Sequence, residues 1–374
     1  MLMAVGLRLF DLRQDLEGGS LRALRPARSE NLEKYMKQAV MTAPGEILIH
    51  EIEAPNPGPG EVLLRIQRIG VCGSDVHVYH GMHPYTSYPV VQGHEYSASI
   101  EAIGPGVDGL EPGMKVTSTP QIICGECGPC QRGDYHICDD LKVEGFQAPG
   151  CAQELWVTSA EKIVPLPNNF SHEEGALVEP VSVAVHAITR ACSLKDHNVA
   201  VLGAGPIGNL VAQVAQAEGA KVLITDLSDY RLQIAQSCGL TFTSNAGEED
   251  LATASKSVFG SAGFDVVFEC VGIEDTMTAA IENIQKGGTI IVVGVFGEKP
   301  RVNLGLVQDR ELNLHGTLMY QRADYERAVE LINSKKIVTS PLYSKHFTID
   351  EYSAAYKFIE AQGDKSMKIF IDLN

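Results

Sequence analysis

The spacing of apolar and polar residues changes near residue 190. Between about residues 37 and 165, short apolar runs such as 62–66 and 97–103 are separated by turns rich in Gly and Pro. From 198 to about 318, apolar runs of strand length alternate with segments of helical period. The predicted buried strands are 199–202, 222–225, 264–268 and 289–293, and the predicted helices are 207–218 and 230–238. Such alternation predicts a parallel sheet with helices on both faces.

The order of these two sequence patterns predicts two domains. A length of 374 residues suits two domains of ordinary size. A helix is expected over 324–334 and a final strand over 367–372, after the alternating region has ended. We therefore expect a β-rich domain made of 36–188 and 320–374, with an α/β domain of 189–319 inserted between its two parts.

The first 35 residues differ from the rest of the chain. No small-residue cleavage site follows their apolar start, which argues against a secretory signal, and their acidic residues argue against a transit peptide. We expect residues 1–35 to form a weakly ordered extension. The alternative is a short helix involved in assembly.

Charge and composition narrow the classes of partner. The chain has 30 basic and 47 acidic residues and a net charge of −17, without a basic block, so we expect no nucleic-acid partner. The apolar run 289–296 is far shorter than the ~18 residues of a membrane span, so we expect no membrane partner. Four of the nine cysteines fall between positions 124 and 138. Clustered cysteines favour metal binding in a cytoplasmic protein over disulfides.

A glycine-rich motif follows the first strand of the α/β region. It reads G-x-G-x-x-G and consists of Gly203, Gly205 and Gly208, with Pro206 and Ile207 opening the helix. The first glycine permits a tight turn, the second lets the backbone approach a pyrophosphate, and the third lets the helix lie close to the strand. The helix N-terminus then favours the anionic pyrophosphate. The alternative is a Rossmann-like fold without a cofactor.

The residues around this motif favour NAD over NADP. Asp226 ends the second strand, 23 residues after Gly203, where its carboxylate can accept hydrogen bonds from the ribose and repel a 2′-phosphate. The next residue is Leu227, so no arginine is placed to receive such a phosphate. Arg231 could stack on the adenine or could be solvated. Val293, at the end of the fourth predicted strand, completes the expected cofactor-binding residues.

Four cysteines predict a structural zinc site. Their spacing is C-x2-C-x2-C-x7-C, with glycines that let the backbone wrap around one ion. Four thiolates close a tetrahedral zinc site, which leaves no position for a substrate. A disulfide pair or an iron–sulfur cluster are the alternatives. The four residues are Cys124, Cys127, Cys130 and Cys138.

A second set of metal-ligand residues lies upstream, in two Gly-marked loops. Cys72 begins a segment that reads Cys-Gly-Ser-Asp-Val-His, and His94 and Glu95 follow 22 residues later. Cys72, His94 and Glu95 would supply one sulfur, one nitrogen and one oxygen ligand and leave a fourth position open. An open fourth position is typical of catalytic rather than structural zinc.

The combined motifs resemble the zinc-dependent medium-chain dehydrogenases over about residues 36–374. The His94-Glu95 pair and the Val178-Glu179-Pro180 segment are similar to the polyol (sorbitol, xylitol), threonine and butanediol dehydrogenases of that superfamily. The resemblance implies a GroES-like catalytic domain beside a Rossmann domain, two zinc ions per chain, NAD and a homotetramer or homodimer.

The same resemblance implies roles for individual residues. Cys72, His94 and Glu95 would ligate the catalytic zinc, and the four clustered cysteines would ligate the structural one. Glu179 would be an optional fourth ligand or a partner of the zinc-bound water. Ser74 and His77 would relay the substrate proton through the cofactor ribose to solvent. A histidine suits that role because its reference pKa is near 6.5.

These features predict a zinc- and NAD-dependent dehydrogenase of a small secondary alcohol, above all a polyol or a sugar-derived alcohol. Vicinal diols and L-threonine are alternative substrates, because Met319 stands where sorbitol-type enzymes place a substrate-binding arginine. The alternative of another class is an inactive relative that binds the cofactor. An inactive relative would tolerate loss of Cys72, His94, Glu95 or Ser74, and all four are present.

Overall fold

The computed structural model describes residues 34–191 and 193–373. A parallel sheet of six strands has the order β12-β11-β10-β13-β14-β15. The strands are β10 (Asn198–Leu202), β11 (Lys221–Asp226), β12 (Phe242–Asn245), β13 (Val266–Glu269), β14 (Thr289–Val292) and β15 (Asn313–Gly316). Because β10 pairs with both β11 and β13, the direction of strand addition reverses there. In open parallel sheets this reversal creates the crevice in which ligands bind.

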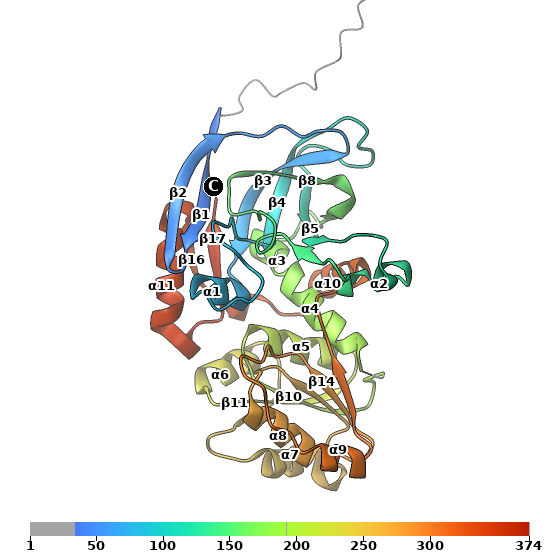
Figure 1. Ribbon diagram of the computed structural model, residues 1–374. Helices are drawn as coiled ribbons and strands as arrows, with labels where there is room; N and C mark the ends of the chain where they lie inside the picture. Colours follow the sequence, from blue (N-terminus) through green and yellow to red (C-terminus); the bar gives the residue numbers. More distant parts are fainter. Residues whose placement is uncertain (1–33, 192, 374) are drawn as a thin grey trace, which may run out of the picture. The chain divides into compact units, whose positions relative to one another are not determined.

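Helices cover both faces of the parallel sheet (Figure 1). Val199 and Val201 of β10 pack with the helices on one face, whereas Ala200 and Leu202 pack with those on the other. This alternation follows from the two-residue period of a strand. The helices of the first face are α5 (Pro206–Ala217) and α6 (Asp229–Ser237), and those of the second are α7 (Leu251–Phe259), α8 (Glu274–Asn283) and α9 (Leu304–Asp309).

A seven-stranded, mostly antiparallel sheet forms the second core. Its main path is β16-β17-β3-β4-β5-β9, and β8 also pairs with β3. The strands are β3 (Glu61–Gly70), β4 (Glu95–Ile103), β5 (Lys115–Ser118), β8 (Leu155–Ser159), β9 (Ile163–Pro165), β16 (Tyr343–Thr348) and β17 (Lys368–Asp372). The β17 strand lies antiparallel to β3, with Ile371 opposite Ile69. Residues from beyond the parallel sheet therefore complete a sheet that begins near residue 61.

The remaining elements surround these two sheets. Two further strand pairs are β1 (Tyr35–Ala43) with β2 (Glu46–Glu53), and β6 (Gln121–Ile122) with β7 (Lys142–Val143). The other α-helices are α1 (Gly73–Tyr79), α2 (Gly128–Gln131), α3 (His172–Ala176), α4 (Val178–Thr189), α10 (Arg322–Asn333) and α11 (Tyr352–Gln362). The 3-10 turns are η1 (Tyr135–Ile137), η2 (Ala160–Lys162), η3 (Gly260–Ala262), η4 (Ser340–Leu342), η5 (Ile349–Glu351) and η6 (Gly363–Lys365).

The predicted fold class is confirmed, because a doubly wound parallel sheet stands beside a β-rich sheet. Most predicted element ends differ from the observed ones by one or two residues, but β3 continues to Gly70, four residues beyond the predicted run 62–66. The first strand begins at Tyr35. Residues 1–33 of the predicted extension lie outside the described residues. The predicted domain division stays a prediction. No helix among the described residues is long and apolar enough to cross a membrane.

Candidate active site

Cys72, His94 and Glu95 come together where β3 ends and β4 begins, two neighbouring inner strands of the antiparallel sheet. Cys72 is the N-cap of α1, His94 lies in the loop before β4, and Glu95 is the first residue of that strand. Their ligand atoms all lie within 4.8 Å of one another. His94 and Glu95 are buried, and Cys72 is partly exposed. The structure thus gathers the three residues that the sequence predicts as ligands of one ion.

Asp75 lies beside both Cys72 and His94. Its carboxylate is buried and accepts a hydrogen bond from the backbone N–H of Cys72 at 3.0 Å. Its other oxygen lies 3.7 Å from Nδ1 of His94. A carboxylate on that side of the ring favours Nδ1 as the protonated nitrogen, which leaves Nε2 for a metal. Gln92 supports Asp75 from behind, because its amide lies 3.3 Å from Oδ1 and accepts a hydrogen bond from Tyr356.

Glu95 is paired with a lysine that the sequence analysis missed. Nζ of Lys368, on β17, lies 2.6 Å from Oε2 of Glu95, and both side chains are buried. The second carboxylate oxygen, Oε1, is buried and has no hydrogen-bond partner among the described residues. Buried carboxylate oxygens normally have partners, so this free oxygen fits a metal ligand.

The electrostatics of the cluster also call for a cation. Burial raises the pKa of the Cys72 thiol, and the nearby Glu95 carboxylate raises it further. A bound divalent cation reverses this effect and deprotonates a coordinating thiol. One thiolate, one imidazole and one carboxylate form a zinc ligand set with an open position. The residues present therefore fit a catalytic zinc ion.

Glu179 lies at the same site, near the start of α4. It is buried, and Tyr320 donates a hydrogen bond to its Oε1 at 2.5 Å. Burial raises the pKa of Glu179 to about 7, against the opposing influence of His94. Tyr320 is itself fixed, because Gln121 donates a hydrogen bond to its carbonyl oxygen at 2.7 Å. The contact of Tyr320 with Glu179 was not predicted from the sequence.

Ser74 and His77 lie on α1, as its second and fifth residues, and not in a loop as expected. The helix begins at Gly73 because the Asp75 carboxylate accepts the N–H of the N-cap residue. Ser74 is partly buried and His77 is exposed. No hydrogen bond joins them within the described part of the chain. Their proton-relay role stays a prediction.

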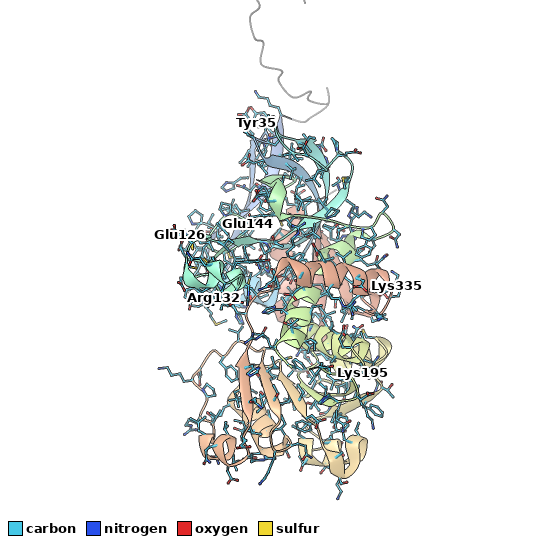
Figure 2. All side chains as sticks on the ribbon, turned by 90° about the vertical axis from the view of Figure 1, so that its right-hand side faces the viewer. Tyr35, Glu126, Arg132, Glu144, Lys195 and Lys335 are labelled. Carbon is cyan, nitrogen blue, oxygen red and sulfur yellow. The ribbon has the colours of Figure 1, made fainter. Side chains whose placement is uncertain are left out.

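The four clustered cysteines also lie together. Their sulfur atoms lie within 4.8 Å of one another, around α2 and η1. Backbone N–H groups of Asp139 and Cys130 hydrogen-bond to the Cys127 sulfur and lower its pKa to about 7. Such bonds favour the thiolate form that binds metal. None of the eight described cysteines forms a disulfide. Figure 2 shows Glu126 and Arg132 at the outer end of this lobe.

The glycine-rich turn lies between β10 and α5, at the point where the strand order reverses. Gly203 has a φ of 98°, in the left-handed region that favours glycine. Gly205 is the N-cap of α5, and Pro206 occupies the first turn. Ile207 packs against the core from the same turn. Val293 lies one residue beyond the end of β14, at the same end of the sheet as this turn.

Asp226 is the last residue of β11 and lies beside this turn. One carboxylate oxygen accepts the N–H of Ala204 at 2.6 Å, and the other accepts the N–H of Ser228 at 2.9 Å. A carboxylate has about four acceptor positions, so both oxygens keep capacity for ribose hydroxyls. A terminal guanidinium nitrogen of Arg231 lies 3.8 Å from Oδ2 of Asp226, and Nε of Arg231 is buried without a partner in the part of the chain that the structure describes.

Alanine at Gly208 and at Gly205 should have opposite effects. A Cβ at Gly208 would lie 1.9 Å from the Gly203 carbonyl oxygen, whereas a Cβ at Gly205 meets only Arg231, at 4.0 Å. We expect Gly208→Ala to cost about 1–3 kcal/mol of folding stability or more, because backbone must move. Gly205→Ala should fold normally and bind NADH at least about tenfold more weakly, since the methyl group fills the pyrophosphate approach.

Thermal unfolding and NADH fluorescence titration check this pair of variants. Equal stability of Gly208→Ala and the unmodified protein would contradict the close approach of α5 to β10. Unchanged NADH affinity of Gly205→Ala would contradict the placement of the pyrophosphate.

Comparisons with known proteins agree with this geometry. Residues 58–168 match the family described as alcohol dehydrogenase GroES-like domain, and residues 206–334 match the zinc-binding dehydrogenase family. The 2-dehydro-3-deoxy-L-galactonate 5-dehydrogenase of Pseudoalteromonas atlantica is 36% identical over 319 residues, or 85% of this chain and 93% of that protein. The sorbitol dehydrogenase of Halalkalibacterium halodurans is 34% identical over 332 residues, or 87% and 96%.

A solved structure extends the similarity to the whole architecture. The 2R,3R-butanediol dehydrogenase of Bacillus subtilis superimposes with a TM-score of 0.83 at 26% sequence identity. The match covers 91% of this chain and 100% of that one. The similarity therefore includes both sheets rather than either one alone.

Proposed function

Because the chain belongs to the zinc-dependent medium-chain dehydrogenases, we propose that it oxidises a polyol or sugar-derived secondary alcohol to the ketone. Membership makes it a zinc-binding, nicotinamide-linked alcohol oxidoreductase. The observation that carries the proposal is the cluster of Cys72, His94 and Glu95, in which the buried Oε1 of Glu95 has no hydrogen-bond partner in the described chain. A complete ligand set argues against an inactive relative.

Zinc and the nicotinamide would supply the chemistry, and the protein would hold and orient them. Zinc, when bound, lowers the pKa of an alcohol hydroxyl towards neutrality, and the nicotinamide, when bound, accepts a hydride. We propose that Cys72, His94 and Glu95 hold the catalytic zinc and that the four-cysteine cluster holds a second, structural zinc. Asp75 and Lys368 orient two of the catalytic ligands through the contacts described above.

The proton released from the substrate needs a path out of the site. We propose that Ser74 receives it and that exposed His77 passes it to solvent, with the cofactor ribose between them. Tyr320 occupies Oε1 of Glu179, so Oε2 is the oxygen that could ligate zinc or hold a water. The C-terminal ends of the parallel strands, next to Gly203, Gly205 and Asp226, would hold the dinucleotide.

We propose NAD rather than NADP as the cofactor. The two oxygens of Asp226 lie at the end of β11, where a 2′-phosphate would meet a negative charge. Arg231 is turned towards Asp226, with a guanidinium nitrogen 3.8 Å from its carboxylate. A net charge of −17 supports the absence of nucleic-acid and anionic membrane partners.

We also propose a cytoplasmic homo-oligomer, a dimer or a tetramer. All four residues of β15 are exposed, and this strand forms one edge of the parallel sheet. Leu314 and Leu318, in and after β15, are 36% and 55% exposed. An exposed edge with apolar side chains is a surface that a second copy of the chain can cover.

Vicinal diols are a second candidate substrate class, because of Met319. Its side chain packs against the core cluster and offers no group to a substrate hydroxyl. Other residues of the site would then have to bind the additional hydroxyl groups of a polyol.

The deciding experiment is NADH formation at 340 nm by zinc-loaded protein, against polyols, vicinal diols, sugar acids and L-threonine. Each substrate is run with NAD and with NADP, and the bound zinc is counted. Turnover of a polyol or diol with NAD alone and two zinc ions per chain is the expected result. Preference for NADP, or turnover of L-threonine alone, would contradict the proposal.

A further inference from the structure

We propose that His83 determines substrate specificity by hydrogen-bonding a second hydroxyl group of the substrate, an inference that rests on the proposed function. His83 lies in the loop that connects α1 with β4. Residues of the catalytic cluster lie before α1 and directly after this loop, because Cys72 precedes the helix and the loop leads into His94 and Glu95. The end of the loop therefore adjoins the predicted metal ligands.

Two contacts fix the His83 ring beside the metal site. It stacks on Phe146, with ring centroids 4.8 Å apart and an angle of 21° between the planes. Phe146 also contacts the ring of His94, with a centroid spacing of 4.9 Å. Nδ1 of His83 lies 2.7 Å from Oγ1 of Thr86. His83 is therefore one aromatic ring away from a zinc ligand and is held in one orientation.

The other ring nitrogen is left for a ligand. Nε2 of His83 makes no hydrogen bond to any residue in the described part of the chain, and the ring is only partly buried. A substrate hydroxyl both donates and accepts, so it can bind Nε2 in either tautomer. Partial burial and the neighbouring His77 and His94 lower the pKa of His83, which keeps the ring neutral. A neutral ring suits a hydroxyl better than a carboxylate or a phosphate.

Met319 and Tyr320, which follow the parallel sheet, offer no free polar side-chain atom for this hydrogen bond. Met319, after the last strand of the parallel sheet, packs into the core. The hydroxyl of Tyr320 is engaged by Glu179. Nε2 of His83 is a free polar atom beside the metal ligands, and it can distinguish a diol or polyol from a simple secondary alcohol.

Two substrates that differ by one hydroxyl group test this inference, namely 2,3-butanediol and 2-butanol. His83→Phe keeps a ring that can stack on Phe146 but removes both nitrogens. We expect kcat/KM for 2,3-butanediol to fall about ten- to a hundredfold, mainly through KM, with that for 2-butanol changed less than about threefold. The affinity of 2,3-butanediol for the protein–NADH complex, followed by NADH fluorescence, should weaken by a similar factor. His83→Gln, which can place an amide near Nε2, should restore part of the diol preference.

His80→Phe is the matched control, because His80 is an exposed residue of the same loop that faces Glu360 at 3.4 Å. It should leave both substrates unaffected. An equal loss for both substrates in His83→Phe, or no loss for either, would overturn the inference while the proposed function stands. Failure of the unmodified protein to oxidise any alcohol of the panel would instead overturn the proposed function, and the inference with it.

Discussion

Replacement of Cys72 by serine is expected to lower kcat/KM about a thousandfold or more while the fold stays intact. In the proposed catalytic site, the thiolate would supply one of three protein ligands and one of the two negative charges that balance zinc. A neutral serine hydroxyl replaces neither, and loss of the metal removes several kcal/mol of transition-state stabilisation. Cys72 lies at the N-cap of α1, where serine is a favourable residue, so the helix should not suffer.

Cys127→Ser is the matched comparison, because it removes one thiolate from the other zinc cluster. That cluster leaves no open position, so its loss should reduce stability rather than chemistry. We expect a lower unfolding temperature, with kcat of the folded, zinc-loaded protein retained within about threefold. Bound zinc, circular dichroism and initial rates at 340 nm distinguish the two variants. If both variants lost the same property to the same degree, the division into catalytic and structural zinc would be wrong.

The second large effect is expected at Lys368. Its ammonium group is the only hydrogen-bonding partner that the described residues give to the Glu95 carboxylate. Lys368→Met leaves a buried carboxylate without a counter-charge, and breaking such a pair costs about 3–5 kcal/mol. We expect that loss in urea unfolding of the metal-free protein. Bound zinc should reduce the difference in unfolding free energy between Lys368→Met and the unmodified protein. The cation neutralises the Glu95 carboxylate when the lysine is absent.

Lys335→Met provides the control for this experiment. Lys335 and Glu174 have the same 2.6 Å spacing, but the Lys335 side chain is 64% exposed. An exposed pair of this kind contributes less than about 1 kcal/mol. Equal destabilisation by the two substitutions would contradict the role of Lys368 as the buried counter-charge of Glu95.

Local patterns were sufficient to predict the strand, turn and helix to which cofactor binding is assigned by our proposal. A tight turn between strand and helix has a fixed chemistry, so Gly203, Gly208 and Asp226 could be placed from their spacing alone. The ligand types at Cys72, His94 and Glu95 were predictable in the same way. Each lies next to a glycine or beside another ligand in the sequence, which makes the pattern visible.

Residues that join the site through tertiary pairing could not be predicted. Lys368 and Glu95 are 273 positions apart, and Tyr320 and Glu179 are 141 apart. The one local signal for Lys368 is a charged residue within the apolar run 367–371. That signal indicates a buried partner but does not identify it. Phe146 lies in a loop whose path depends on the whole antiparallel sheet.

The short helix α1 was missed because its start lacks the usual signals. Helices commonly begin after Ser, Thr, Asp or Asn, whereas Cys72 and Gly73 occupy that place here. The compensating contact comes from the Asp75 carboxylate, three residues after Cys72. A helix that lacks an N-cap signal and is stabilised by tertiary contacts is easily predicted to be a loop.

The place of β17 in the antiparallel sheet has a kinetic consequence. The parallel sheet is made from one continuous stretch, Asn198 to Gly316, so its contacts are relatively local. The pairing of β17 with β3 closes a loop of about three hundred residues, as the 304-residue separation of Arg68 and Asp372 shows. Long-range pairings form slowly unless the intervening chain is already compact.

During refolding, the capacity to bind dinucleotide should therefore appear first, and capture of the catalytic zinc should follow as a late step. A chromogenic zinc indicator and NADH fluorescence, recorded in one stopped-flow experiment with Cys127→Ser to silence the other metal cluster, would order the two events. Zinc capture before dinucleotide binding would contradict this sequence. If dinucleotide binding comes first, the rate of zinc binding reports the rate of the last stage of folding.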